Sequence, residues 1–276
     1  MIPLPPITDF TCVKVVYGSG GNFEHYLFEG GRDHGTNPKG TWFYQKAVLS
    51  CSPSKGGDYV VMIIHGDTNW LSFVKAGQSK WQVASTLAVS GRDRYADCVY
   101  HDGRFCTLTL HGMVEKWDID KMNEPRREVV VAAKHHLGPI LTRHLVSTPW
   151  GDLLQVRAVL AVEYPDGIRF QIHKVDPDGC KKVSKNDFVD HALFLGLNHS
   201  ACLPTENFPG ARALCIYFSA PWMTQTFHWL RPIRRSWGGV RTYDLKRRKF
   251  EHALPLCDRG GSISPPPSEV WITPYL

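Results

Sequence analysis

The sequence predicts an all-β fold, a partial β-propeller of about four four-stranded blades with an incomplete fifth. Three observations predict it. Segments of alternating apolar and polar residues recur along the chain, glycine-containing turns separate them, and no amphipathic helix longer than about two turns is present. Because one blade cannot bury both of its faces by itself, a chain that contains one blade must supply others at a similar period.

The clearest blade is expected at residues 95–133 and begins with three strands joined by two tight turns. Gly103 and Gly112 lie in these turns, where glycine can take the positive φ that hairpin turns require. Apolar and polar residues alternate along the strands, which places the apolar ones on one face. We expect core positions at Cys98, Phe105 and Trp117.

Three further blades are expected at comparable spacing. The pair His65-Gly66 precedes the equivalent pair His111-Gly112 by 46 residues, which is a normal blade length. The third strands of three blades end alike, in a hydrophobic residue followed by an aspartate (Asp118, Asp176 and Asp244). The four blades are placed at residues 43–84, 95–133, 140–184 and 191–254.

The two ends of the chain fit this plan less completely. Residues 1–42 are expected to form an incomplete N-terminal blade remnant ahead of a propeller domain at residues 43–276. Residues 270–275 read as a closing strand without a blade of its own, and the candidate partner is the segment 10–28. An incomplete ring would leave strand edges of its first and last blades unpaired.

Composition predicts a globular intracellular protein, in the cytoplasm or the nucleus. Of the residues 43% are hydrophobic and 12% aromatic, which argues against disorder. The N-terminus lacks the pattern of a signal peptide, and no apolar stretch approaches membrane-spanning length, so no membrane association is expected. The eight cysteines are scattered without a C-x-x-C spacing, which favours reduced thiols and no zinc site.

No catalytic, cofactor or metal site is expected. The glycine-rich stretch 18–21 lacks the Lys-Ser/Thr that follows in a phosphate loop, and the G-x-S-x-G and H-E-x-x-H motifs are absent. His135 and His136 would point to opposite faces of a strand, so they do not converge with His144 on one ion. The segment 176–179 is a standard turn sequence rather than a calcium loop.

A propeller enzyme of the glycosidase type is the less favoured alternative. Such an enzyme would need several carboxylates that converge at the central channel. The expected inward strands at residues 46–50 and 192–196 contain none. The sequence therefore favours a protein that is not an enzyme.

The most basic segment, residues 231–249, contains eight basic residues and one acidic residue. Aromatic residues lie among them, and exposed Arg and aromatic side chains are the usual anchors of protein interfaces. The patch fits an acidic partner protein, a phosphorylated segment or, less well, nucleic acid, whereas the alternative interpretation is a solvated turn between two strands. The candidate partner-binding residues are Arg231, Arg234, Arg235, Trp237, Arg241, Arg247 and Arg248.

Several segments resemble a known family. Residues 190–219, the segment GGVRTYDLKRRKFE at 238–251 and the closing PPPSEVWITPYL resemble the plant F-box-associated KIB-type β-propeller family, long catalogued as a domain of unknown function. Residues 46–66 and 95–118 fit the same pattern, so the resemblance covers residue 43 to the C-terminus. It implies the fold that the strand pattern predicts.

The resemblance also implies a function in protein recognition. Members of the family typically carry an N-terminal F-box that docks on the Skp adaptor of a cullin-type ubiquitin ligase, while the propeller holds the protein to be ubiquitinated. Residues 1–42 contain no F-box pattern, so a Skp-type adaptor is expected as a partner only if an F-box lies upstream.

The expected function is therefore a non-catalytic interaction propeller that resembles the substrate-recognition part of F-box proteins, here without an F-box, and that binds a protein partner the sequence does not identify. The alternative is an F-box-free binding module for an acidic or phosphorylated partner or for nucleic acid.

Overall fold

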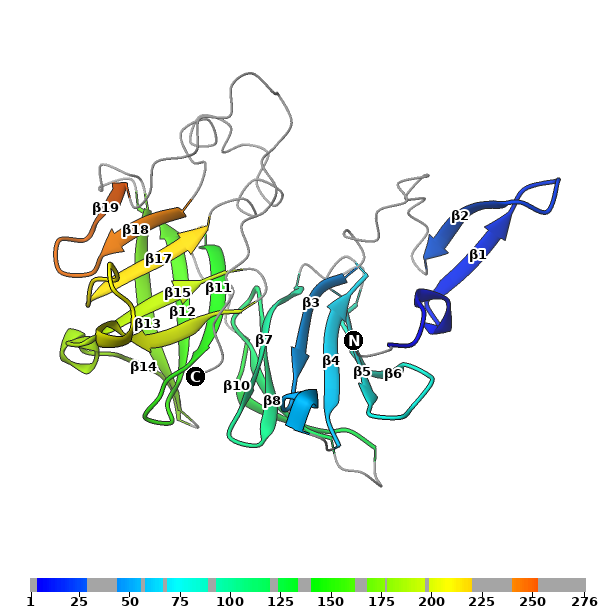
Figure 1. Ribbon diagram of the computed structural model, residues 1–276, viewed down its shortest axis with the longest axis horizontal. Helices are drawn as coiled ribbons and strands as arrows, with labels where there is room; N and C mark the ends of the chain where they lie inside the picture. Colours follow the sequence, from blue (N-terminus) through cyan, green and yellow to red (C-terminus); the bar gives the residue numbers. More distant parts are fainter. Residues whose placement is uncertain are drawn as a thin grey trace, which may run out of the picture. The chain divides into compact units, whose positions relative to one another are not determined.

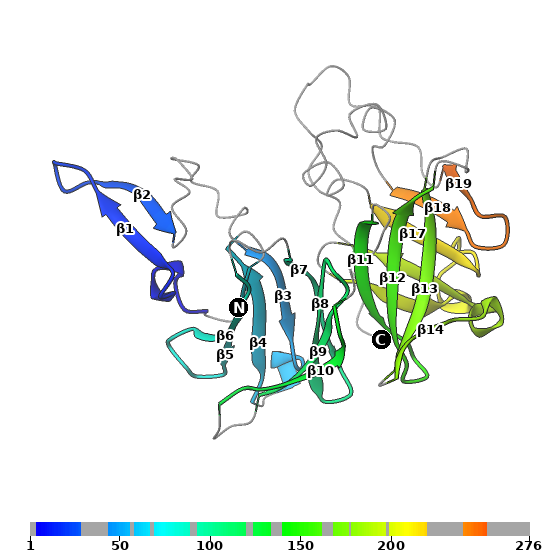
Figure 2. The ribbon, with the colours of Figure 1, turned by 180° about the vertical axis from the view of Figure 1, so that it is seen from behind.

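The computed structural model describes residues 4–28, 44–55, 58–66, 69–88, 93–119, 124–133, 140–161, 168–176, 178–196, 199–219 and 240–252. Their regular structure is β-strand with a few short 3-10 helices (Figures 1 and 2). The chain divides into two compact units, which we name unit 1 (residues 1–111 and 115–128) and unit 2 (residues 112–114 and 129–276). Within the described ranges, no helix has the length and apolar composition needed to cross a bilayer.

The first blade of unit 1 is a sheet of order β3-β4-β5-β6 in which all neighbours are antiparallel. Val61 and Ile63 of β4 are buried in one core cluster, and Met62 and Ile64, which point to the opposite face, are buried in another. Both faces of this blade are covered, which explains why β4 is a continuous apolar run. The strands are β3 Tyr44–Leu49, β4 Val60–His65, β5 Trp70–Lys75 and β6 Gln82–Thr86.

One face of this sheet is covered by the N-terminal segment of the chain. Phe10 stacks on Trp81 with ring centroids 5.0 Å apart, and the indole N–H of Trp81 donates a hydrogen bond of 3.0 Å to the Pro5 carbonyl. Cys12 and Val13 are buried in the same cluster. The elements of this segment are η1 Ile7–Asp9, followed by β1 Val13–Tyr17 and β2 Phe23–Phe28, which pair as a two-stranded sheet.

The second blade has the order β10-β9-β8-β7 and agrees with the expected pattern. Cys98, Phe105 and Trp117 are 1%, 2% and 2% exposed, so all three predicted core positions are confirmed. They share a cluster with residues of the first blade. The strands are β7 Tyr95–His101, β8 Arg104–Thr109, β9 Val114–Asp118 and β10 Arg126–Val131.

Both predicted turns of this blade adopt left-handed backbone. Asp102 and Gly103 have φ values of 48° and 76°, the pair of positive values that a two-residue type I′ hairpin requires. Gly112 has φ 85° and its counterpart in the first blade, Gly66, has φ 57°. The glycines from which the blade period was inferred therefore lie at positions with positive φ, which glycine adopts without steric cost.

Unit 2 contains two sheets that pack face to face (Figures 1 and 2). The third blade has the order β11-β12-β13-β14, with strands β11 Ile140–Ser147, β12 Leu153–Leu160, β13 Ile168–Asp176 and β14 Gly179–Lys182. The fourth has the order β16-β15-β17-β18-β19, with strands β15 His191–Leu195, β16 Ala201–Pro204, β17 Cys215–Ser219, β18 Val240–Asp244 and β19 Lys249–His252. The short helices are η4 Lys185–Phe188 and η5 Thr205–Asn207, and η3 Pro53–Lys55 lies in unit 1.

The core of unit 2 is aromatic where the two sheets meet. Phe170 of β13 contacts the rings of Phe218 and Tyr243 on the facing sheet, with centroids 5.1 Å apart in both pairs and interplanar angles of 72° and 64°. Edge-to-face contacts of this kind add to the stabilisation from apolar burial. They fix the position of β13 against β17 and β18.

The fold class is confirmed, with one strand that the sequence did not predict. The fourth blade has five strands, because β16 returns antiparallel to β15 and leaves β17 to pair with β15 in parallel. Each of the other three blades has four strands, as expected. The predicted closing strand at 270–275 lies outside the described residues.

Candidate partner-binding site

The described part of the basic segment is the hairpin formed by β18 and β19. Its turn is organised by Asp244, whose Oδ1 accepts hydrogen bonds of 2.8 Å from the backbone N–H groups of Lys246 and Arg247. The N–H of Arg248 donates to the Asp244 carbonyl at 2.7 Å, and Arg248 has φ 55°. The aspartate that ends β18 therefore closes the turn, as the recurring hydrophobic-Asp pattern suggested.

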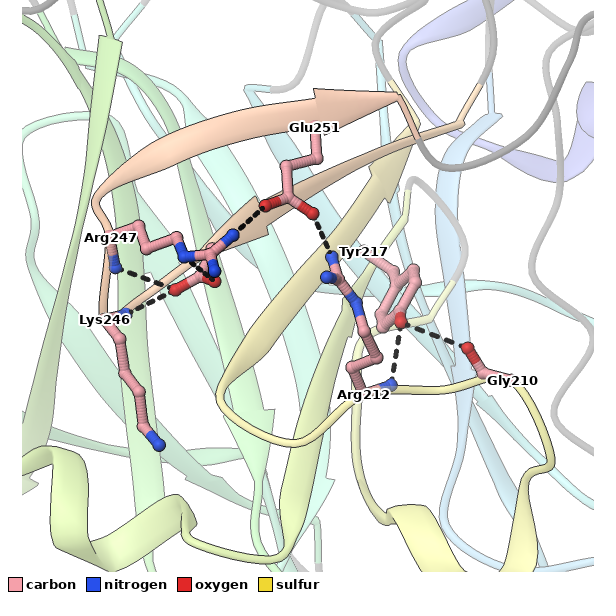
Figure 3. Close-up of polar contacts among 7 residues, drawn as sticks. Gly210, Arg212, Tyr217, Lys246, Arg247 and Glu251 are labelled. Atoms are coloured by element: carbon pink, nitrogen blue, oxygen red, sulfur yellow. Dashed lines mark hydrogen bonds and ion pairs between the residues drawn. The ribbon is translucent and has the colours of Figure 1, made fainter.

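Acidic side chains neutralise part of this hairpin. Figure 3 shows Arg247 and Arg212 reaching the two carboxylate oxygens of Glu251, at 3.3 Å and 2.6 Å. The Arg212 hydrogen bond holds the pKa of Glu251 below its usual range. The backbone N–H of Arg212 also donates to the Tyr217 hydroxyl at 2.8 Å. Arg247 is thus engaged within the fold, although its side chain is 65% exposed.

Arg248 has a different environment from its neighbour Arg247. It lines a cavity of about 340 Å³ in unit 2, between the β13-β14 hairpin and the β18-β19 turn. Volumes of this size lie at the lower end of the range for ligand pockets. Two adjacent arginines of one turn therefore play different roles, one in an ion-pair network and one at a cavity.

The floor of the cavity is apolar. Phe170, Tyr243, Phe188 and Leu245 line it and are all buried, and each belongs to the core cluster of unit 2. Their positions are fixed by that packing, including the aromatic contacts between β13 and β18. The cavity therefore has a rigid hydrophobic floor.

The remaining lining residues give the cavity a positive charge. Among the described lining residues three are basic (Arg169, Lys182 and Arg248) and none is acidic. Lys182 and Arg248 are exposed, and no acidic side chain of the described chain lies within ion-pair distance of either. The polar lining residues are Arg169, Gln171, His173, Lys182, Ser184 and Arg248.

The register of the β13-β14 hairpin brings two of these residues together. Asp176 pairs with Gly179 at the turn, and three residues further along each strand His173 pairs with Lys182. Arg157 lies 3.0 Å from His173 Nε2. Because a guanidinium only donates, that nitrogen accepts, which corresponds to a neutral imidazole in this arrangement.

β14 is shorter than β13 and leaves part of that strand's edge open. The last bond between them joins the Val183 N–H to the Ile172 carbonyl at 3.3 Å. In an antiparallel sheet the N–H and C=O of a residue face the same side and alternate along the strand, so those of Phe170 face this same edge. No strand of the described chain pairs with Phe170 there. The cavity lies along this free edge.

The predicted partner-binding residues thus fall into three groups. Arg248 lines the cavity and Arg247 is part of the ion-pair network. Arg241 is only 9% exposed in β18, and partner binding at this position stays a prediction. The others lie outside the described residues (Arg231, Arg234, Arg235 and Trp237). Sequence reasoning missed Arg169 and Lys182, which come from a different blade.

The buried carboxylates of unit 1 are engaged with cations. Lys46 of β3 and Asp97 of β7 form a buried ion pair, and the Cys98 N–H donates to the same Asp97 oxygen at 2.8 Å. Glu115 is fully buried and lies 2.6 Å from Arg127. The first strand of the second blade, β7, therefore does carry a carboxylate, unlike the first strands of the first and fourth blades, on which the sequence-based expectation rested.

Three other titratable side chains of the described chain are buried, namely Cys106, Cys202 and His65. Burial raises the pKa of Cys106 to about 11 and that of Cys202 to about 12, so both are protonated thiols at neutral pH. Burial lowers the pKa of His65 to about 3, and its Nε2 lies 2.8 Å from the Ser72 hydroxyl. No metal-ligand cluster occurs among the residues that the structure describes, and His135 and His136 lie outside them.

Comparisons with known proteins were made for sequence and for structure. A family model described as KIB1-4 beta-propeller matches residues 1–244, and so includes residues 1–42. No curated protein sequence matches significantly. A crystal structure of a levansucrase mutant from B. megaterium matches with 10% identity and a TM-score of 0.32, over 66% of this chain and 62% of that chain. That match spans less than two thirds of the levansucrase chain, and at this similarity it carries no conclusion about catalysis.

Proposed function

The chain belongs to the KIB1-4 β-propeller family, and from this premise we propose that it is a non-catalytic module that binds a partner protein, in the manner of the substrate-recognition part of an F-box ubiquitin ligase. The family match favours an interaction module over an enzyme. Recruitment of a Skp-type adaptor would depend on an F-box and is separate from what the propeller does.

The observation that carries this proposal is the cavity of unit 2. It combines an apolar floor with exposed cations, and this combination of buried apolar area and peripheral charge is typical of sites that anchor a partner's side chain. The enzyme alternative lacks such support, because both buried carboxylates of the described chain are ion-paired.

Site-specific photo-crosslinking in cells tests the proposal. A photo-reactive amino acid at Ser184, an exposed residue of the cavity lining, is expected to capture a discrete partner protein. The matched control carries the same group at Gln82, an exposed residue of β6 in unit 1. The captured protein is then used as bait and should retrieve the full chain.

Two results would contradict the proposal. One is capture of chaperones alone at Ser184. The other is an identical set of products from Ser184 and Gln82, which would indicate nonspecific proximity.

A further inference from the structure

We propose that the cavity lined by Arg169, Lys182 and Arg248 binds the phosphate group of a phosphorylated side chain on the partner protein. This inference rests on the proposed function and names the chemistry that the site recognises. It assigns the site to the β13-β14 hairpin and the residue 248 side of the β18-β19 turn, rather than to the basic segment as a whole.

The positive charge of the cavity lining favours a ligand group that carries about two negative charges. Three basic residues line the site without an acidic residue among the described lining residues. A phosphomonoester carries a charge of about −1.5 to −2 at neutral pH and offers three acceptor oxygens, whereas a carboxylate carries a single charge. The guanidinium group of Arg248 supplies a planar donor pair that suits phosphate oxygens.

The size and surroundings of the cavity identify a side chain rather than nucleic acid. A volume of about 340 Å³ holds one side chain, and its apolar floor fits the carbon part of that side chain. Nucleic acid would require an extended basic surface. On the outer side of the turn Asp244 and Glu251 interrupt such a surface, and Glu251 binds both Arg247 and Arg212.

The backbone of Arg248 is left-handed, as it is at Asp102 and Leu214. A non-glycine residue with φ 55° is in the left-handed region, which costs free energy for residues with a Cβ. Glycine would suit this turn better, yet the position carries a long cation that lines the cavity. Of these three residues Arg248 lines the cavity, and strained residues of this kind are enriched at functional sites.

The free edge of β13 can bind the backbone of the partner's peptide on either side of the phosphorylated residue. Phe170 presents its N–H and C=O beside the cavity, where an extended peptide can pair with them as an added strand. A phosphorylated side chain projecting from that peptide would then enter the cavity. Main-chain pairing supplies affinity and the cations supply selectivity for phosphate.

Degenerate peptide pools test the inference on the full chain. Each pool has one fixed central residue, either phosphoserine, phosphotyrosine, glutamate or glutamine, with identical random flanks. We expect retention of at least one phosphorylated pool at least about tenfold above the glutamate and glutamine pools, since a charge-assisted hydrogen bond corresponds to roughly a tenfold or larger effect.

The variants locate the site. Arg248→Gly and Lys182→Ala should each reduce retention of the phosphorylated pool about tenfold or more, whereas Arg247→Ala should leave it unchanged. Arg248→Gly is chosen because glycine relaxes the left-handed turn, so the variant folds and a loss of binding reports the missing guanidinium. Circular dichroism and the thermal midpoint of each variant verify folding.

Three outcomes would overturn the inference. The first is equal retention of the glutamate and phosphorylated pools, and the second is no retention of any phosphorylated pool by the wild-type chain. The third is an equal effect of Arg247→Ala and Arg248→Gly, which would move binding to the outer face of the turn. In each case crosslinking from Ser184 still decides separately whether the propeller holds a partner.

Discussion

The buried carboxylates of unit 1 and the cavity cations of unit 2 have different surroundings. In unit 1 buried charges are matched inside the fold: Lys46 pairs with Asp97, and Glu115 lies beside Arg127 and accepts a 2.9 Å hydrogen bond from Thr107. In unit 2 the sheets meet through an aromatic core, and the cations of the adjoining cavity face no acidic lining residue among those described.

The comparison distinguishes charged groups that are paired within the fold from charged groups that can bind a ligand. A buried ion pair leaves little free-energy gain for a third partner, because desolvation has already been offset by the pair itself. Exposed cations on a rigid apolar floor retain their capacity to bind. The basic segment predicted from sequence mixed the two kinds, and only the structure separates Arg247 from Arg248.

The largest effect is expected from breaking the buried pair of unit 1. Lys46→Met removes the cation and leaves Asp97 charged in a site where its side chain is 2% exposed. We expect the free energy of unfolding to fall by about 3 to 5 kcal/mol, measured by urea denaturation. The double variant Lys46→Met/Asp97→Leu should recover most of this loss. If the single and double variants are equally unstable, the pair is not the cause.

A smaller effect is expected from lowering the pH, again in unit 1. Burial lowers the pKa of His65 in the folded chain to about 3, whereas the ordinary pKa of 6.5 applies in the unfolded chain, so below pH 6.5 the unfolded chain binds a proton that the folded chain does not. The contribution of His65 to the free energy of unfolding is constant above pH 6.5. Below pH 6.5, protonation of His65 in the unfolded chain lowers the free energy of unfolding by about 1.4 kcal/mol for each pH unit, down to about pH 3.

Comparison with His65→Gln isolates this contribution. Between pH 6.5 and pH 4.5 the wild-type chain should lose about 2 to 3 kcal/mol more than the variant, measured as the difference in the free energy of unfolding. Parallel pH profiles for the two proteins would show that His65 is not buried in the neutral form.

In unit 2 the corresponding substitutions should hardly change stability. Arg248→Gly relieves left-handed strain and is expected to raise the free energy of unfolding by up to about 1 kcal/mol, partly offset by the greater freedom of glycine in the unfolded chain. Differential scanning calorimetry measures this change. A clear loss of stability would mean that the guanidinium is a structural contact, as the cations of unit 1 are.

The smallest effect is expected for Arg247→Ala. Its ion pair with Glu251 is exposed to solvent, and pairs of this kind contribute little to stability. The thermal midpoint should be indistinguishable from that of the wild-type chain at moderate salt. A marked decrease would assign the network of Figure 3 a structural role that its exposure does not suggest.

Much of the fold could be predicted because its signals are local. Gly103 and Gly112 mark turns through their own φ values, and the alternation around Cys98 and Phe105 reports which residues face the core. The strand β16 could not be predicted, because ALFLG and the later ALCIYFS read as consecutive strands and the short segment between them carries no alternation.

The site was less accessible to prediction because two separate blades build it. The Pro-Asp-Gly turn fixes the register of the β13-β14 hairpin, so the pairing of His173 with Lys182 could have been counted from the sequence. The approach of the residue 248 turn to that hairpin depends on how the two sheets pack, which no local pattern encodes. The density of basic residues identified the segment 231–249, but it did not indicate that Arg248 lines the cavity while Arg247 pairs with Glu251.

Hydrogen–deuterium exchange on the full chain, with and without a saturating phosphopeptide pool, tests the central claim most directly. The account predicts slower exchange at residues 168–173 of β13, including the Phe170 amide, and at residues 244–248, with no change in β3 to β9. Protection confined to the strands of unit 1, or identical protection by the phosphorylated and glutamine pools, would contradict it.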